Sequence, residues 1–172
     1  MDATALRREA PLSAPKEPAR LFVLPGQVVV AQEPAHLVTV LGSCVSVCLF
    51  DARSGVGGLN HIVFSGVPSE AESDACKWST PAMERLVGQA IAAGARVDRL
   101  QAKVFGGAQV SPGPSGGVFR LGERNVEAAL WELGLKKIPL LAKDTGGYRG
   151  RKLVFESHTG RVWVKELVRE RP

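Results

Sequence analysis

The amino-acid sequence predicts an α+β fold, a layered α/β sandwich with mixed or antiparallel sheets and hairpins. Short β-rich runs, separated by Gly- and Pro-containing turns, recur over most of the chain. Apolar residues at helical spacing occur in two segments, one between Thr80 and Gly94 and one over 123–133. Because the expected strands outnumber the helices and mostly follow one another through short turns, a doubly wound parallel sheet is disfavoured.

The individual elements follow from local patterns. From Cys44 to Leu49, small polar or cysteine residues alternate with Val and Leu, so Cys44 is expected on the face opposite the valines. A polar turn over 51–58 leads to a strand over 59–64, which predicts an antiparallel hairpin. Thr80-Pro81 supplies an N-cap and a favoured first helical residue. The other expected strands are 21–24, 27–31, 36–41, 100–105, 138–142, 152–156 and 161–167.

One domain over residues 21–172 is expected. Residues 1–20 combine prolines with mixed charges and show no apolar period, which predicts a disordered leader. Polar residues over 65–78 predict a loop, and the Pro/Gly-rich stretch over 110–117 predicts a mobile one. No apolar stretch is long enough for a membrane span or a signal region, so we expect a cytoplasmic protein without membrane insertion.

Composition disfavours several classes of function. The formal net charge is +5, but Lys and Arg are scattered and aromatic residues make up only 6%, so nucleic acid is not expected as a ligand. The three cysteines are an odd number without CxxC spacing, which disfavours a disulfide framework and a structural metal. Phosphate-binding glycine motifs are absent from the sequence, so nucleotide binding has no support.

Cys44 is the candidate nucleophile. It follows Gly42 and Ser43 and begins a strand. These small residues leave the sulfur approachable and let backbone amides point at a bound oxygen, as acyl transfer requires. The alternative is that Cys44 is a small core hydrophobe, as most buried cysteines are.

His61 is the candidate base, on the strand expected to pair with the Cys44 strand. A neighbouring imidazole is the usual way to activate a thiol whose free pKa is about 8.5. The alternative is a hydrogen-bonded core histidine. A third polar group is expected to orient the imidazole ring. Asn60 is disfavoured because adjacent residues on a strand face opposite ways, whereas Thr39 and Ser43 offer hydroxyls nearby. The alternative for Thr39 is that it serves packing alone.

Five segments, in this order and spacing, are specific as a set although each is modest alone. They are 39–48 (TVLGSCVSVC), 57–61 (GGLNH), 102–108 (AKVFGGA), 121–126 (LGERNV) and 143–147 (KDTGG), the last followed by Gly-Arg-Lys at 150–152. Together they resemble the CheD family, the chemoreceptor glutamine deamidases of bacterial chemotaxis, and the resemblance covers residues 21–168.

The resemblance implies hydrolysis of glutamine side-chain amides on methyl-accepting chemotaxis receptors, through a cysteine thioester and without a cofactor or metal. It also implies an architecture similar to the catalytic domain of the cytotoxic necrotizing factor toxins. By position, Cys44 matches the nucleophile and His61 the general base. The family's third residue is a threonine shortly before the cysteine; Thr39 is the nearest match, and in some relatives it falls one place earlier, where this chain has Val38.

The partners implied are the receptors, as substrate, and a CheC-type phosphatase, and we expect a monomer. The loops over 65–78 and 110–117 are candidates for the rim that accepts a receptor helix. Two other functions stay open: a non-enzymatic adaptor that binds a CheC-type phosphatase, and a cysteine hydrolase or transferase acting on a small amide. The presence of both Cys44 and His61 disfavours the adaptor.

Overall fold

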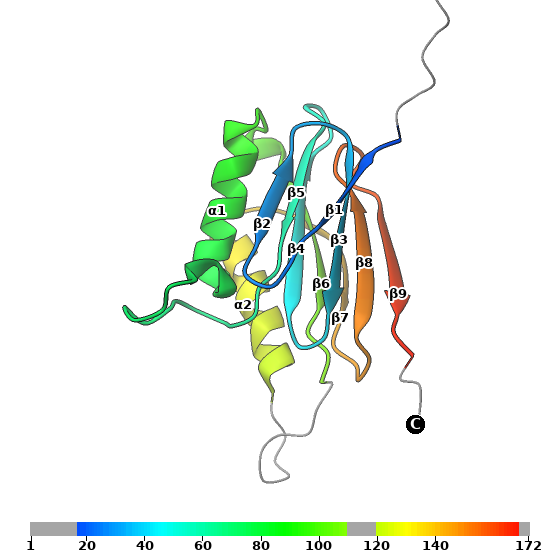
Figure 1. Ribbon diagram of the computed structural model, residues 1–172. Helices are drawn as coiled ribbons and strands as arrows, with labels where there is room; N and C mark the ends of the chain where they lie inside the picture. Colours follow the sequence, from blue (N-terminus) through cyan, green and yellow to red (C-terminus); the bar gives the residue numbers. More distant parts are fainter. Residues whose placement is uncertain (1–16, 110–119, 169–172) are drawn as a thin grey trace, which may run out of the picture.

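The computed structural model describes residues 17–109 and 120–168, which form three layers: helices, a five-stranded sheet and a four-stranded sheet (Figure 1). The strands are β1 (Ala19–Phe22), β2 (Val28–Ala31), β3 (Ala35–Leu41), β4 (Val45–Asp51), β5 (Val56–Asn60), β6 (Gln101–Gly106), β7 (Leu140–Thr145), β8 (Arg151–Glu156) and β9 (Val162–Glu166). The α-helices are α1 (Ser79–Ala92) and α2 (Leu121–Leu135), and short 3₁₀ helices are η1 (Ala75–Lys77) and η2 (Val97–Arg99). The predicted α+β class is confirmed.

Both sheets are mixed. The five-stranded sheet has the order β2-β5-β4-β6-β7, with a parallel β6–β7 pair and antiparallel pairs elsewhere. The four-stranded sheet has the order β1-β3-β8-β9, with a parallel β1–β3 pair. The predicted hairpins β4–β5 and β8–β9 are confirmed. Most described strand pairs are antiparallel, unlike those of a doubly wound parallel sheet.

The middle sheet separates two hydrophobic cores. On the helix side, Val45 and Val47 pack with Met83 and Leu86 of α1. Between the sheets, Cys48 packs with large apolar side chains that include Phe155 of β8. Each large side chain that is removed from water contributes roughly 1.5–3 kcal/mol. The alternation expected for β4 is therefore confirmed, and Cys44, which is partly buried against the inter-sheet core, lies on the face opposite the valines.

Gly57 and Gly58 belong to β5, although they were expected in a turn. They pair with Phe50 and Leu49 of β4. A Cβ on Gly57 would overlap the carbonyl oxygen of Ser157, so the absence of a side chain lets the β8–β9 turn of the second sheet approach this backbone.

Other boundaries differ because tertiary contacts override local signals. The helix α1 begins at Ser79, not after Thr80, because the Ser79 amide donates to the Phe64 carbonyl and its hydroxyl accepts from the Gly66 amide. Thr80, the expected cap, instead donates its hydroxyl to Glu132 of α2 at 2.6 Å. The loop expected over 65–78 contains η1, and α2 continues to Leu135.

Two expectations fall mainly on residues that are not described. Residues 19 and 20, which were expected in a leader, belong to β1. The rest of the leader up to residue 16, and the loop over 110–117, lie outside the described residues. Within the described part of the chain, neither helix has the length and hydrophobicity that are needed to cross a lipid bilayer.

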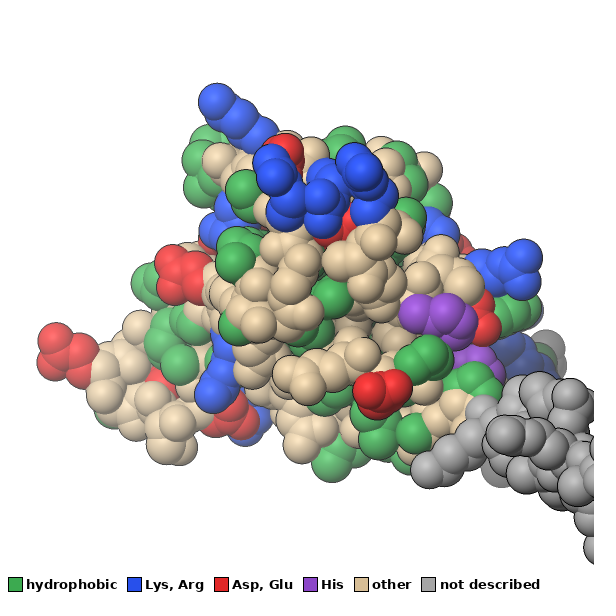
Figure 2. Space-filling model, turned by 90° about the horizontal axis from the view of Figure 1, so that it is seen from above, with side chains coloured by type: hydrophobic (Ala, Val, Ile, Leu, Met, Phe, Trp, Pro, Cys, Tyr) green, Lys and Arg blue, Asp and Glu red, His purple; other side chains and the backbone are tan. Residues whose placement is uncertain are grey.

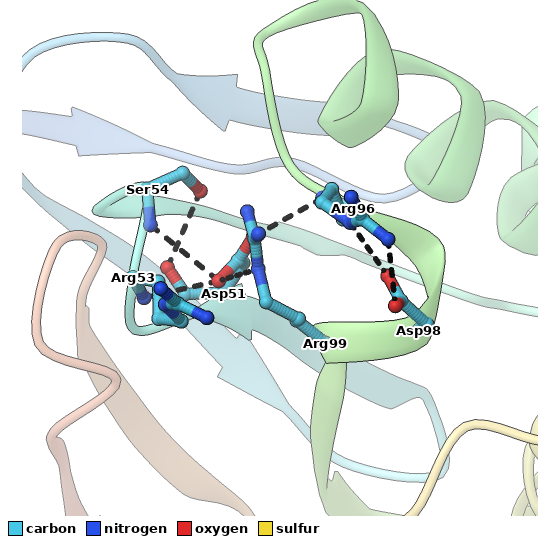
Figure 3. Close-up of polar contacts among 6 residues, drawn as sticks. All are labelled: Asp51, Arg53, Ser54, Arg96, Asp98 and Arg99. Carbon is cyan, nitrogen blue, oxygen red and sulfur yellow. Dashed lines mark hydrogen bonds and ion pairs between the residues drawn. The ribbon is translucent and has the colours of Figure 1, made fainter.

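Asp51 ends β4 at the opposite end of the strand from Cys44, and it organises the turn there (Figure 3). Its carboxylate accepts hydrogen bonds from the Arg99 guanidinium at 2.8 Å and from the backbone amides of Arg53 and Arg96 at 3.0 and 3.1 Å. These donors hold the pKa of the buried Asp51 carboxyl far below its usual range. Figure 2 looks down on this end and shows basic side chains gathered around acidic ones.

We expect Asp51→Asn to lower the free energy of unfolding by about 2 kcal/mol at pH 7, because it removes a buried charge that accepts from the Arg99 guanidinium and from backbone amides. The exposed pair of Arg96 and Asp98 provides the control, and Asp98→Asn should change the free energy of unfolding much less than Asp51→Asn does. Urea titrations at several pH values measure both. Because the folded pKa of Asp51 is lowered, the difference from wild type should shrink as the pH falls below about 4; a difference independent of pH would contradict this.

Candidate active site

Three predicted side chains come from three neighbouring strands at one end of the inter-sheet space. Cys44 directly precedes β4, His61 directly follows β5, and Thr39 lies in β3 of the other sheet. Val45 pairs with Ile62, which makes Cys44 and His61 diagonal neighbours on the same face of the middle sheet. Thr39 and His61 are each 3% exposed, and Cys44 is only partly buried.

Thr39 fixes the tautomer of His61. Its hydroxyl donates to the Val23 carbonyl at 2.7 Å, and its Oγ1 lies 2.8 Å from His61 Nδ1. All three groups are satisfied only when the hydroxyl proton goes to Val23 and Oγ1 accepts from Nδ1–H, so this tautomer is favoured. The lone pair of the imidazole is therefore on Nε2, which is buried and has no hydrogen-bond partner among the described residues. A neutral ring with a free Nε2 can act as a base.

The site favours a neutral thiol beside a neutral imidazole. Burial raises the pKa of the Cys44 thiol, and the backbone N–H of Cys44 offsets part of this effect. Burial lowers the pKa of His61, and the Val23 carbonyl offsets part of that. The described hydrogen bonds include none between Cys44 Sγ and His61 Nε2.

Backbone contacts hold the segment before Cys44. The amide of Gly107 donates to the Cys44 carbonyl and that of Ala108 to the Gly42 carbonyl, both at 2.8 Å. Gly106 has φ +108°, and a Cβ there would overlap the Cys44 carbonyl oxygen. The N–H groups of Ser43 and Cys44 donate to no described backbone carbonyl. They are thus available to a bound oxygen. Gly42, also predicted for this role, anchors the segment through its carbonyl, which does not involve its own N–H.

A cavity of about 340 Å³ adjoins this segment. It lies between α2 and the ends of β6 and β7, and its walls include Gly107, Glu123, Thr145 and the exposed Tyr148. The Gly107 amide that bonds to the Cys44 carbonyl connects the cavity wall to the nucleophile segment. Cys44, His61 and Thr39 themselves do not line this cavity.

Comparison with known proteins shows which family the chain belongs to. The family model described as CheD chemotactic sensory transduction matches residues 65–166, more than half of the chain. A protein of Anaeromyxobacter dehalogenans (strain 2CP-C), named probable chemoreceptor glutamine deamidase CheD 1, is 45% identical over 150 residues, which cover 87% of this chain and 85% of that protein. The chain belongs to the CheD family.

Two further CheD relatives come from Burkholderia. The probable chemoreceptor glutamine deamidase CheD 1 of Burkholderia thailandensis is 40% identical over 148 residues, and the probable chemoreceptor glutamine deamidase CheD of Burkholderia orbicola (strain MC0-3) is 39% identical over 148 residues. Each alignment covers 84% of this chain, but it spans only 62% and 59% of the respective relatives.

The other candidate residues of this CheD chain lie away from the site. Cys48 is fully buried, and desolvation strongly raises the pKa of its thiol. Cys76 lies in η1, and His36 lies 3.7 Å from Glu156. Within residues 17–109 and 120–168, no three His, Cys, Asp or Glu side chains gather in a way that could hold a metal ion.

Asn60 is correctly predicted to face away from His61. Its Oδ1 accepts from the Val47 amide, and its Nδ2 lies 3.4 Å from Met83 Sδ in the helix-side core. Sequence reasoning missed two other groups, the Val23 carbonyl and the Asn125 side chain. Asn125 belongs to one of the five segments that resemble CheD proteins, but a backbone carbonyl has no side-chain signal in the sequence.

We expect the neutral His61 ring to carry its proton on Nδ1, because Thr39 Oγ1 has only acceptor capacity left. Long-range ¹H–¹⁵N NMR at pH 7.5 measures the tautomer. Thr39→Val should shift the ring toward a mixture with the Nε2–H form, whereas Thr39→Ser, which keeps the hydroxyl, should not. A wild-type ring protonated on Nε2 would contradict the assignment.

Proposed function

We propose that this CheD chain hydrolyses glutamine side-chain amides on methyl-accepting chemotaxis receptors to glutamate and ammonia, as part of bacterial chemotaxis adaptation. The observation that carries the proposal is the fixed tautomer of His61, which leaves Nε2 free on the face of the sheet that also carries Cys44. The names of the relatives, chemoreceptor glutamine deamidases, support the choice of substrate.

The reaction begins when His61 Nε2 takes the proton of Cys44 as Sγ attacks the amide carbon. The N–H groups of Ser43 and Cys44 donate to the oxyanion of the tetrahedral intermediate. The C–N bond then breaks as His61 returns the proton to the departing ammonia, which leaves a thioester on Cys44. Water attacks the thioester with His61 again as base, releasing glutamate and the thiol. Thr39 holds the ring and stabilises its Nδ1–H form throughout.

An open site suits a glutamine on another protein. Cys44 is only partly buried, and the segment between β5 and α1 projects from the body of the molecule at the same end (Figure 1). That segment begins after Val63, which the register places opposite Cys44. We propose that residues 65–78 form part of the rim that contacts a receptor helix. A cytoplasmic location, a monomeric state and a CheC-type phosphatase as second partner complete the proposal.

Cys44→Ala should lower ammonia release from a purified receptor cytoplasmic fragment at least about 1,000-fold, because no other thiol reaches the site. The matched control is Cys48→Ala, which should stay within about threefold of wild type per folded molecule. A coupled enzymatic ammonia assay measures both, and mass spectrometry of the receptor locates the converted glutamines.

Each other outcome points elsewhere. Release from free glutamine but not from the receptor would identify a hydrolase of small amides. No release from either substrate would favour a non-enzymatic adaptor that binds a CheC-type phosphatase. Equal losses for Cys44→Ala and Cys48→Ala would contradict the single nucleophile.

The pH dependence of kcat/KM should follow His61. The base must be neutral, and burial lowers its pKa below the ordinary value of about 6.5. Activity should therefore persist as the pH falls from 8 to about 6.5 and decline only at lower pH. Initial rates between pH 4.5 and 8.5, with circular dichroism to confirm folding, test this; an acid limb centred above 6.5 would contradict it.

A further inference from the structure

Asn125 connects α2 to the segment before β4 and to the segment after β5, beside the candidate nucleophile. Its Nδ2 donates to the Ser43 carbonyl at 3.0 Å and to the Val63 carbonyl at 2.9 Å. Ser43 precedes Cys44 in the chain, and Val63 is opposite Cys44 in the register set by the Val45–Ile62 pair. Asn125 is fully buried, and both amide protons are used, one on each carbonyl.

The Ser43 carbonyl and the Cys44 N–H belong to one peptide unit. The structure has no cis peptide bonds among the described residues, so in this planar trans unit the two groups point in opposite directions. Asn125 draws the carbonyl toward α2, on the helix side of the middle sheet. The Cys44 N–H therefore points away from α2, and no described backbone carbonyl accepts from it.

We propose that Asn125 is a positioning residue that orients the Ser43–Cys44 peptide so that the Cys44 N–H faces the oxyanion formed during acyl transfer. The inference rests on the proposed role of Cys44 as nucleophile. Asn125 does not touch the substrate and acts only through the peptide that it holds. Without its amide, the carbonyls of Ser43 and Val63 would lose this donor, and the peptide would be free to turn.

Two reagents that are attacked by the same sulfur distinguish this role from a general loss of structure. With p-nitrophenyl acetate, Sγ adds to the ester carbonyl and forms an oxyanion, which collapses to an acetyl thioester as p-nitrophenolate leaves. With iodoacetamide, Sγ displaces iodide, and no oxyanion forms. Both reactions need the thiol proton to be lost, so the ratio of their rates at Cys44 isolates the stabilisation of the oxyanion.

We expect Asn125→Leu to slow acylation of Cys44 by about 10- to 100-fold, which is somewhat less than the effect of removing an oxyanion-hole donor outright. Alkylation of Cys44 should slow by less than about threefold. Asn125→Asp, which keeps the shape but offers at most one donor, should change the ratio in the same direction and by less. Released p-nitrophenolate and mass spectrometry of the Cys44 peptide measure the two rates, with Cys44→Ala as background.

The matched control is Asn60→Leu. Asn60 is equally buried and also bonds to a backbone group of the nucleophile strand, the Val47 amide, but on the helix side and away from Cys44. This variant should lose comparable stability in thermal melts and keep the wild-type ratio.

Two outcomes would overturn the inference: a ratio that is unchanged in a folded Asn125 variant, or a wild type that is not acylated at Cys44. If Asn125→Leu fails to fold, Asn125→Asp decides. Neither reagent involves a receptor, so absence of ammonia release from the receptor would count against the proposed deamidation alone, and an unchanged ratio against the role of Asn125 alone.

Discussion

The hydrogen bonds of Thr39 are the constraint on which the candidate site depends. Its hydroxyl donates its proton to the Val23 carbonyl, which can only accept. Its oxygen is then left to accept a hydrogen bond from Nδ1–H of His61. That carbonyl belongs to Val23, whose amide bonds to the Val38 carbonyl next to Thr39. The tautomer of His61 in the five-stranded sheet is therefore favoured by a backbone carbonyl next to a strand of the other sheet. The candidate site is therefore complete only when the two sheets are packed together.

This arrangement has an electrostatic consequence. The inter-sheet core that positions His61 also removes it and the thiol from water, which disfavours an ion pair of thiolate and imidazolium. In the proposed reaction, the sulfur loses its proton as charge moves onto an acceptor oxygen that the backbone can bind. Cys48, on the same face of β4 but completely buried, has neither an imidazole partner nor access. The position of a cysteine relative to the sheet end thus separates a candidate nucleophile from a core residue.

The sequence predicted what depends on neighbouring residues. Period two placed Cys44 opposite the valines, and the hairpin placed His61 on the same face of the sheet, because both facts follow from β4 and β5 alone. The partner of His61 required knowledge of how the two sheets stack, so Thr39 could be only one of several nearby hydroxyls. The start of α1 at Ser79 depends on the Phe64 carbonyl and the Gly66 amide, which no local capping signal reveals.

Each of the three layers supplies a different part of the candidate site. The middle sheet carries Cys44 and His61, the outer sheet contributes Thr39, and the helix layer contributes Asn125. Thr39 and Asn125 approach from opposite faces, one setting the direction of a proton and the other the direction of a peptide. No single side chain of the middle sheet could contact groups on both of its faces, since a strand presents each side chain to only one face. A three-layer fold is therefore what allows one short strand end to be controlled from both sides.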